Sequence, residues 1–162
     1  MDCCESGSTL RFLIPVACAF GVDTQFIGRG RLPQRPITPY LEEFPKHGVS
    51  FEYNNTMPFS TNGKLTGGKF YVDGGISSQF ITGLLFALPL LEEDSEIILT
   101  SHLESKPYVD ITLGTLREHG CQVAETENGY FVKGGQHYMP FSGRVEAVSY
   151  THLRAHETLM NL

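Results

Sequence analysis

The chain has 162 residues, 41% of them hydrophobic and 19% charged, which is enough apolar material for one globular core. Its formal net charge of −6 disfavours nucleic acid or an anionic membrane as a partner, because both attract a basic face. We expect no membrane span and no signal peptide, and the four cysteines, which lack metal-site spacing, favour free thiols in a reducing cytoplasm.

The first predicted element is an apolar helix. Leu10 to Phe20 is apolar enough for a largely buried helix, with a Ser or Thr as its N-cap. Pro15 lies inside this run and should kink or shorten the helix, because proline has no N–H to donate. A loop rich in Gly and Arg follows over residues 28–36.

A second helix and a strand follow this loop. Ile37 to Phe44 predicts a short helix that Pro45 ends, with His47-Gly48 as its exit. Val49 to Tyr53 alternates between apolar and polar side chains, which predicts a strand.

The second half of the chain alternates predicted strands and helices, which indicates a mixed α/β fold. Gly120 should close a helix in the left-handed conformation, and Asn128-Gly129 should form a hairpin turn. The predicted elements are the strand Phe70–Asp73, the helix Ser77–Leu91, the strand Glu96–Thr100, the helix Tyr108–His119 and the hairpin strands Gln122–Ala124 and Tyr130–Val132.

One arrangement occurs twice along the chain. Arg35-Pro36, a predicted helix, His47-Gly48 and a strand recur as Lys106-Pro107, a helix, His119-Gly120 and a strand. Two copies of a strand–helix–strand unit about 70 residues apart explain this echo without a solenoid repeat.

Residues 148–162 depart from the pattern just as a strand at 144–146 begins. Their sequence resembles translated sequencing-adaptor DNA, so we interpret 148–162 as a non-native tail and 1–147 as the native part. His152 and His156 lie at i and i+4, a spacing that suits a metal pair on a helix. Because no third ligand is evident, we predict no metal site there.

Small polar residues gather at three predicted helix starts, at residues 5–9, 74–79 and 105–108. Backbone N–H groups and hydroxyls at a helix N-terminus suit phosphate or carboxylate, although Ser and Gly are also ordinary capping residues. Three such starts, together with Arg29, Arg31 and Arg35 in one loop, indicate a shared anionic ligand. The pattern by itself predicts a phosphate-binding protein and leaves its reaction open.

Four blocks of sequence resemble the 5-enolpyruvylshikimate-3-phosphate synthase family, in the right order and at plausible spacing. They are Glu5–Arg11, Gly30–Ile37, Gly75–Phe80 and Ser105–Leu113, and the resemblance runs from residue 2 to about residue 147. The Ser77-Ser78-Gln79-Phe80 and Ser105-Lys106-Pro107-Tyr108 motifs are together highly specific.

The resemblance implies a fold of βαβαββ units, the inside-out α/β barrel of the enolpyruvyl transferases. Three such units make one domain of a two-domain enzyme. Residues 1–147 would then be an incomplete domain of about two units, from the domain nearer the N-terminus.

The resemblance also implies a reaction, the transfer of the enolpyruvyl group of phosphoenolpyruvate to the 5-hydroxyl of shikimate 3-phosphate, with release of phosphate. It implies no metal or cofactor, a monomeric parent enzyme and a cytoplasmic location. Residue by residue, it assigns Ser77, Ser78, Gln79, Ser105 and Tyr108 to shikimate 3-phosphate, and Gly7, Arg35 and Gln79 to phosphoenolpyruvate.

The resemblance assigns no catalytic residue within this chain. The family's Lys-Ser block would precede Met1, and its general-base Asp and further Lys and Arg residues would follow residue 147. We therefore predict that the chain alone has almost no activity, because such catalysis depends on charges that close around both substrates.

Two alternatives remain. The related enolpyruvyl transferase that acts on UDP-N-acetylglucosamine commonly carries a catalytic Cys where this chain has Gly30, which counts against it. A non-catalytic phosphate-binding α/β module or interaction domain is the other; only an enzyme fragment would prefer shikimate 3-phosphate to unrelated phosphates.

The remaining polar residues have mostly structural interpretations. Arg11 and Lys106 are divided evenly between structural and binding roles, Asp110 should pair locally, and Cys4 stands where the family pattern predicts Gly. We expect exposed charges at Glu42, Glu43, Glu92, Glu93 and Asp94, and surface or helix-end roles at His47, His102, His119 and His137.

Overall fold

Helices and strands alternate along residues 1–143, the part of the chain that this computed structural model describes. The elements are α1 (Gly7–Ala19), β1 (Thr24–Phe26), η1 (Leu32–Gln34), α2 (Thr38–Glu43), η2 (Phe44–His47), β2 (Val49–Glu52), β3 (Phe59–Gly63), β4 (Gly68–Val72), α3 (Ser78–Ala87), η3 (Leu88–Leu90), β5 (Ser95–Leu99), α4 (Lys106–Glu118), β6 (Val123–Thr126) and β7 (Gly129–Val132), where η denotes a 3₁₀ helix. The predicted strand at 144–146, the boundary at 147 and the tail at 148–162 lie outside the described residues.

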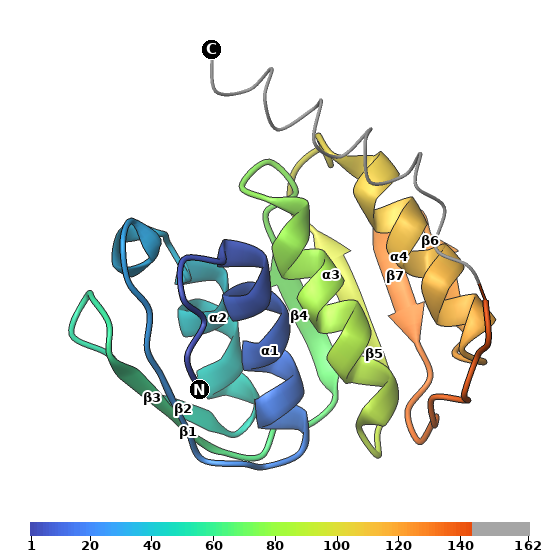
Figure 1. Ribbon diagram of the computed structural model, residues 1–162. Coiled ribbons are helices and arrows are strands. Elements are labelled where there is room, and N and C mark those ends of the chain that lie inside the picture. Colours follow the sequence, from blue (N-terminus) through green and yellow to red (C-terminus); the bar gives the residue numbers. More distant parts are fainter. Residues whose placement is uncertain (144–162) are drawn as a thin grey trace.

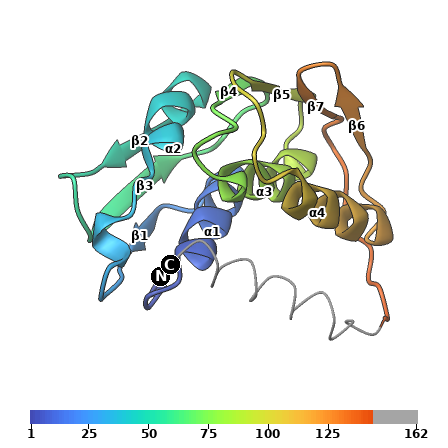
Figure 2. The same cartoon turned by 90° about the horizontal axis from the view of Figure 1, so that it is seen from above.

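Two sheets support a row of helices. One sheet is antiparallel with the order β1-β3-β2, and the other has the order β4-β5-β7-β6, in which only β4 and β5 are parallel. Helices α1, α3 and α4 lie side by side in front of these sheets (Figure 1), and the view from above shows the same layers (Figure 2). The mixed α/β prediction is confirmed.

The order of elements repeats. β4-α3-β5-α4-β6-β7 is one complete βαβαββ unit, and α1-β1-α2-β2-β3 follows the same order with its first strand missing from the described residues. Asp2 forms an isolated parallel bridge with Ile27, at the place where β4 pairs with β5 in the complete unit. The internal echo therefore reflects two copies of one unit.

The two copies also share their turn chemistry. A carboxylate oxygen of Asp2 accepts from the N–H of Cys4 at 2.7 Å, and that of Asp73 accepts from the N–H of Gly75 at 2.9 Å. Cys4 has φ 51°, in the left-handed region that favours glycine. The predicted Gly at this position thus matches the backbone conformation, even though the residue is Cys.

Pro15 was predicted to kink or shorten the first helix. Helix α1 runs through Pro15, so the prediction of a shortened helix was wrong. A proline at this position leaves the carbonyl of Arg11, four residues earlier, without its helical donor. The hydroxyl of the buried Tyr40 donates to that carbonyl at 2.7 Å and so replaces the missing N–H. An added Cβ at Gly83 would collide with the same hydroxyl and carbonyl, so Gly83 lets α3 approach α1 here.

Other boundaries differ from the predictions in small ways. Strands β1 and β3 were not predicted, since β1 has three residues and β3 has a largely polar sequence, Phe-Ser-Thr-Asn-Gly. Helix α3 ends at Ala87 rather than Leu91, because Pro89 turns the chain into η3. Pro45 does not end the helical path but lies inside η2.

Glu43 is buried, with 5% of its surface exposed, so the prediction of an exposed charge was wrong. Its carboxylate accepts from the backbone N–H of Tyr71 in β4 at 3.0 Å and pairs with Lys46 at 2.5 Å. A carboxylate can be buried when hydrogen bonds satisfy it. Glu43 thus links α2 to β4, which joins the two units. Glu42, Glu92, Glu93 and Asp94 are exposed as predicted.

His47 ends η2 as predicted, but it is buried rather than on the surface. Its ring nitrogens lie 3.2 Å from the carbonyl oxygen of Gly67 and 3.1 Å from that of Lys69, and its ring stacks on Phe70 at 4.0 Å. Sequence alone could not reveal these partners, which come from β4 and the turn before it.

Candidate functional site

Helices α1, α3 and α4 all begin at the same end of the molecule (Figure 1). Their first turns hold most of the predicted site residues. This arrangement follows from the repeat, because each helix leaves the same end of its sheet. The partial positive charges of the three helix N-termini therefore lie at one end of the molecule.

Gly7 and Arg35 are in contact, although they are far apart in the sequence. The nearest atoms to a Cβ added at Gly7 would be Cδ and Nη1 of Arg35, each at 3.2 Å. The missing side chain at Gly7 therefore leaves room for the exposed arginine to lie over the first turn of α1. Ser6 caps that turn by accepting from the N–H of Thr9 at 3.1 Å.

Gln79 joins α3 to α1. Its Oε1 accepts from Nη1 of Arg11 at 2.9 Å, and its Nε2 donates to Oγ of Ser8 at 2.9 Å. Because a guanidinium can only donate, the amide orientation is determined: its oxygen faces Arg11 and its nitrogen faces α1. Three predicted residues, Gly7, Arg35 and Gln79, are thus gathered around the start of α1.

Arg11 is buried with 7% of its surface exposed. Its Nη2 donates to the carbonyl of Pro36 at 3.2 Å, its guanidinium lies 4.6 Å from the centre of the Phe80 ring, and its Nε has no hydrogen-bond partner. Burial, together with the neighbouring charge of Arg35, lowers the pKa of Arg11. Its burial and its contacts with other protein groups argue against direct binding of a ligand, one of the roles that the sequence left open.

Within residues 1–143, no carboxylate forms an ion pair with Arg11 or Arg35. Two guanidinium groups near the start of α1 are therefore not paired with a carboxylate in this part of the chain. Such a place favours a small anion, because backbone N–H groups and arginines bind phosphate or carboxylate oxygens.

Ser77 and Ser78 lie at the start of α3. Oγ of Ser77 accepts from the N–H of Gln79 at 3.3 Å as the helix N-cap, and it is half-buried. Ser78 is buried in the first turn. Both residues therefore adjoin Gln79, but the hydroxyl of Ser77 already has a capping role.

Ser105 and Tyr108 lie at the start of α4, the helix on the far side of α3 from α1 (Figure 1). Both are half-buried, and the N–H of Tyr108 donates to the carbonyl of Ser105 at 3.2 Å. Helices α3 and α4 pack together, with the hydroxyls of Thr82 and Thr112 at 3.1 Å. The two groups of predicted residues are thus connected through α3.

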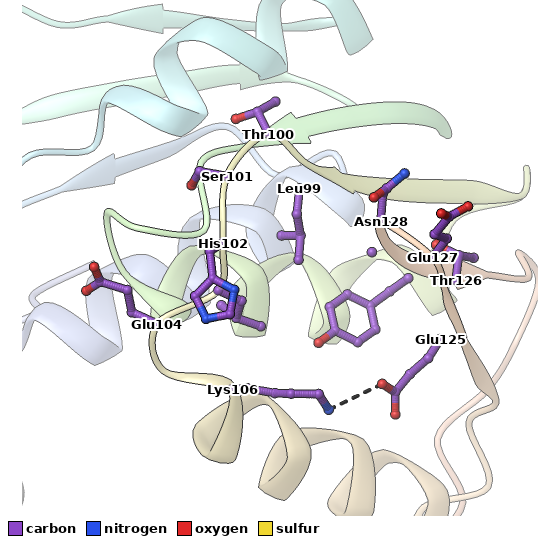
Figure 3. A pocket seen from close by; sticks show the side chains of 13 residues that line it. Leu99, Thr100, Ser101, His102, Glu104, Lys106, Glu125, Thr126, Glu127 and Asn128 are labelled. Carbon is purple, nitrogen blue, oxygen red and sulfur yellow. Dashed lines mark ion pairs between the residues drawn. The ribbon is translucent and has the colours of Figure 1, made fainter.

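A cavity of about 720 Å³ lies beside the start of α4 (Figure 3). The sequence did not indicate it. It is lined by the loop after β5 (residues 99–104), by Lys106 and by the β6–β7 hairpin (residues 125–130).

Lys106 does not offer a free charge to this cavity. Its Nζ lies 2.6 Å from Asp110 and 3.2 Å from Glu125, and Asp110 thus pairs locally as predicted. The hydrogen bonds that Lys106 donates to the carboxylates of Asp110 and Glu125 raise the pKa of Lys106. With Glu104 and Glu127 also lining it, this cavity suits an anion less well than the start of α1.

Among residues 1–143, no helix has the length and apolar content required to cross a membrane. The same residues contain no group of three or more His, Cys, Asp or Glu side chains placed to hold a metal ion.

Comparison with known proteins identifies relatives of this chain. Residues 1–148 match the family described as EPSP synthase (3-phosphoshikimate 1-carboxyvinyltransferase). The 3-phosphoshikimate 1-carboxyvinyltransferase of Clostridium beijerinckii is 45% identical over 148 residues, and that of Clostridioides difficile is 47% identical over 148 residues. Each match covers 90% of this chain and 34% of the relative, so the chain spans about a third of the relatives' length.

Solved structures show the same fold. The EPSP synthase of Acinetobacter baumannii matches 86% of this chain and 31% of its own, with a TM-score of 0.70 and 20% sequence identity. At this identity the likeness concerns the fold alone, and it agrees with the βαβαββ order seen in residues 68–132.

Proposed function

Because this chain belongs to the EPSP synthase (3-phosphoshikimate 1-carboxyvinyltransferase) family, we propose that it supplies one wall of an enolpyruvyl transfer site. The reaction moves the enolpyruvyl group of phosphoenolpyruvate to the 5-hydroxyl of shikimate 3-phosphate and releases phosphate. The observation that carries this proposal is the cluster at the start of α1. There Arg35 lies over Gly7, and Gln79 points its amide nitrogen toward the same turn.

Phosphoenolpyruvate would bind at this cluster. Arg35 can form two parallel charge-assisted hydrogen bonds with a carboxylate or phosphate, and Gly7 allows the ligand to approach the backbone of α1. The Nε2 group of Gln79 adds a neutral donor. The contribution of these groups is to bind and orient the anion and to balance charge in the transition state.

Shikimate 3-phosphate would bind at the starts of α3 and α4. Ser77, Ser78 and Ser105 bring hydroxyls and helical N–H groups that suit phosphate oxygens, and Tyr108 would face the ring of the substrate. Lys106 would not bind this phosphate, because its ammonium group already pairs with the carboxylates of Asp110 and Glu125.

The chain covers about a third of its relatives, so the rest of the proposed site would come from sequence that it does not contain. We expect the 162-residue chain to bind the substrates weakly and to show no turnover in a phosphate-release assay. Reproducible phosphate release that depends on both substrates would contradict this expectation.

Two further properties belong to the same proposal. The four cysteines of the chain are free thiols, which supports a reducing cytoplasm as the place of action. We also propose that the complete enzyme is a monomer, which light scattering of the full-length protein would test.

The alternative functions have less support. Gly30, which stands where the UDP-N-acetylglucosamine enzymes carry a catalytic Cys, has φ 62°, a conformation that favours glycine. A general phosphate-binding module would be expected to bind inorganic phosphate as well as either substrate.

The deciding experiment is a titration of the isotope-labelled chain, followed by NMR. Shikimate 3-phosphate and phosphoenolpyruvate should shift the signals of Ser77, Gln79 and Gly7, whereas inorganic phosphate at equal concentration should shift them much less. Equal responses to all three anions would support the phosphate-binding module. No response to any of them would exclude both.

A further inference from the structure

Arg11 contacts the side chain of Gln79 and the backbone next to Arg35, the two residues whose side chains are proposed to hold phosphoenolpyruvate. Its Nη1 donates to Oε1 of Gln79 at 2.9 Å, and its Nη2 donates to the carbonyl of Pro36, the residue next to Arg35, at 3.2 Å. These two groups come from α3 and from the loop before α2, while Arg11 itself comes from α1. One buried guanidinium thus joins the three segments that form the site.

Only an arginine suits these contacts. The two Nη groups of a guanidinium diverge in one plane, so they can reach two acceptors on different segments while the face of the group lies against an aromatic ring. Arg11 lies 4.6 Å from the Phe80 ring centre. A lysine has one ammonium at the end of its stem and cannot reproduce the fork and the stacking together.

The contact with Gln79 determines which end of the amide faces the ligand. If the amide turned over, its NH₂ group would face the guanidinium, and two donors would oppose each other. The observed orientation instead directs Nε2 toward Ser8 at 2.9 Å, at the first turn of α1. Arg11 therefore presents a donor, rather than an acceptor, to an anion bound there.

We propose that Arg11 is a positioning residue, which fixes the amide of Gln79 and the Arg35-Pro36 segment without touching substrate. The inference rests on the proposed function in one respect, namely that Gln79 and Arg35 contact phosphoenolpyruvate. The position of Arg11 explains why a buried cation is kept without a carboxylate partner in residues 1–143: its hydrogen bonds serve the neighbouring site rather than an ion pair.

The test compares Arg11→Lys and Arg11→Met with the control Arg117→Met, which removes a charge from the exposed end of α4. The first readout is the side-chain amide signal of Gln79 in the chain without ligand, assigned through Gln79→Ala. Both Arg11 variants should move this signal toward that of a free amide, and the control should leave it unchanged.

The second readout is the dissociation constant for phosphoenolpyruvate, measured by NMR titration. Arg11→Lys should weaken binding by at least about tenfold despite keeping the charge, because the loss of an oriented donor corresponds to the strength of a charged hydrogen bond. Arg117→Met should bind within about twofold of the parent chain.

The outcomes separate the two proposals. An unchanged Gln79 signal in a folded Arg11→Lys chain would overturn the positioning role, and so would unfolding of both Arg11 variants, since Arg11 would then be a structural residue. If the parent chain does not bind phosphoenolpyruvate at all, the proposed function fails. The Gln79 signal still decides whether Arg11 orients the amide.

Discussion

Helices α1 and α4 begin at the same end of the molecule but in opposite electrostatic surroundings (Figure 1). At α1, Arg11 and Arg35 have no carboxylate partner within residues 1–143, whereas at α4 Lys106 is held by Asp110 and Glu125. Both helices have the same length and hence similar dipoles. The side chains around a helix start, rather than the dipole, therefore decide whether an anion is favoured there.

Removing one cation at each helix start should give the largest difference, which we expect in the affinity for phosphoenolpyruvate. Arg35→Met should weaken phosphoenolpyruvate binding by about 10- to 100-fold, the equivalent of a charge-assisted hydrogen bond. Lys106→Met should change it by less than about twofold, since that charge is already neutralised. Binding by both variants is measured by NMR titration, and equal losses would contradict the difference between α1 and α4.

Removing the N-cap hydroxyl should lower the free energy of unfolding more at α1 than at α4. Ser6→Ala should lower the free energy of unfolding by about 1 kcal/mol, because Ser6 accepts from the N–H of Thr9. Ser105 makes no such capping bond, so Ser105→Ala should cost less than about 0.5 kcal/mol. Urea unfolding of both variants measures the difference. A larger cost at Ser105 would show that its hydroxyl has a partner in solution.

Two glycines on these helices should respond differently to alanine. No atom lies within 4 Å of a Cβ added at Gly114, so Gly114→Ala should stabilise α4 by about 0.5–1 kcal/mol. Gly7→Ala should stabilise the chain less and should weaken phosphoenolpyruvate binding, because the new Cβ would lie 3.2 Å from the Arg35 side chain. Unfolding and titration measure both effects. A Gly7→Ala chain with unchanged affinity would argue against the Gly7–Arg35 contact as the binding place.

The smallest expected effect is at the start of α3. The hydroxyl of Ser101 and the N–H of Gly75 lower the pKa of Asp73 below its ordinary value of 3.8. A depressed pKa stabilises the folded state at pH values above the pKa that Asp73 has in the unfolded chain. This contribution is lost as the pH falls through the pKa that Asp73 has in the folded state. Asp73→Asn should therefore reduce stability at pH 7 and flatten its decline below about pH 4, measured by thermal unfolding. The same acid dependence in both chains would assign no role to Asp73.

Much of the secondary structure could be predicted because it depends on local signals. Ser6 and Ser77 cap helices, and Gly48 and Gly120 leave them in the left-handed conformation. The predicted hairpin forms one residue earlier than expected, because Glu127-Asn128 is the turn and Gly129 already pairs with Thr126. These preferences depend on a few neighbouring residues. The three-residue β1 has no such signal, and its pairing with β3 comes from a distant part of the chain.

The resemblance identified the site residues, but it did not predict the contacts between them. It assigned Gly7, Arg35 and Gln79 one by one, whereas the link through Arg11 joins residues 68 positions apart. It also left the role of Arg11 open, since a sequence does not tell whether an arginine is exposed or buried against an aromatic ring. The roles assigned to Ser105 and Tyr108 stay predictions.

By itself, the sequence determined most of the helices and strands, the positions of the helix starts and the membership of the family, since these follow from short motifs and local periodicity. Only the tertiary structure decided how polar and strained groups are satisfied. Tyr40 compensates for Pro15, Tyr71 lets Glu43 be buried, and Arg11 orients Gln79. The physical reason is that a buried donor or acceptor needs a partner in space, and folding brings that partner from a distant part of the chain.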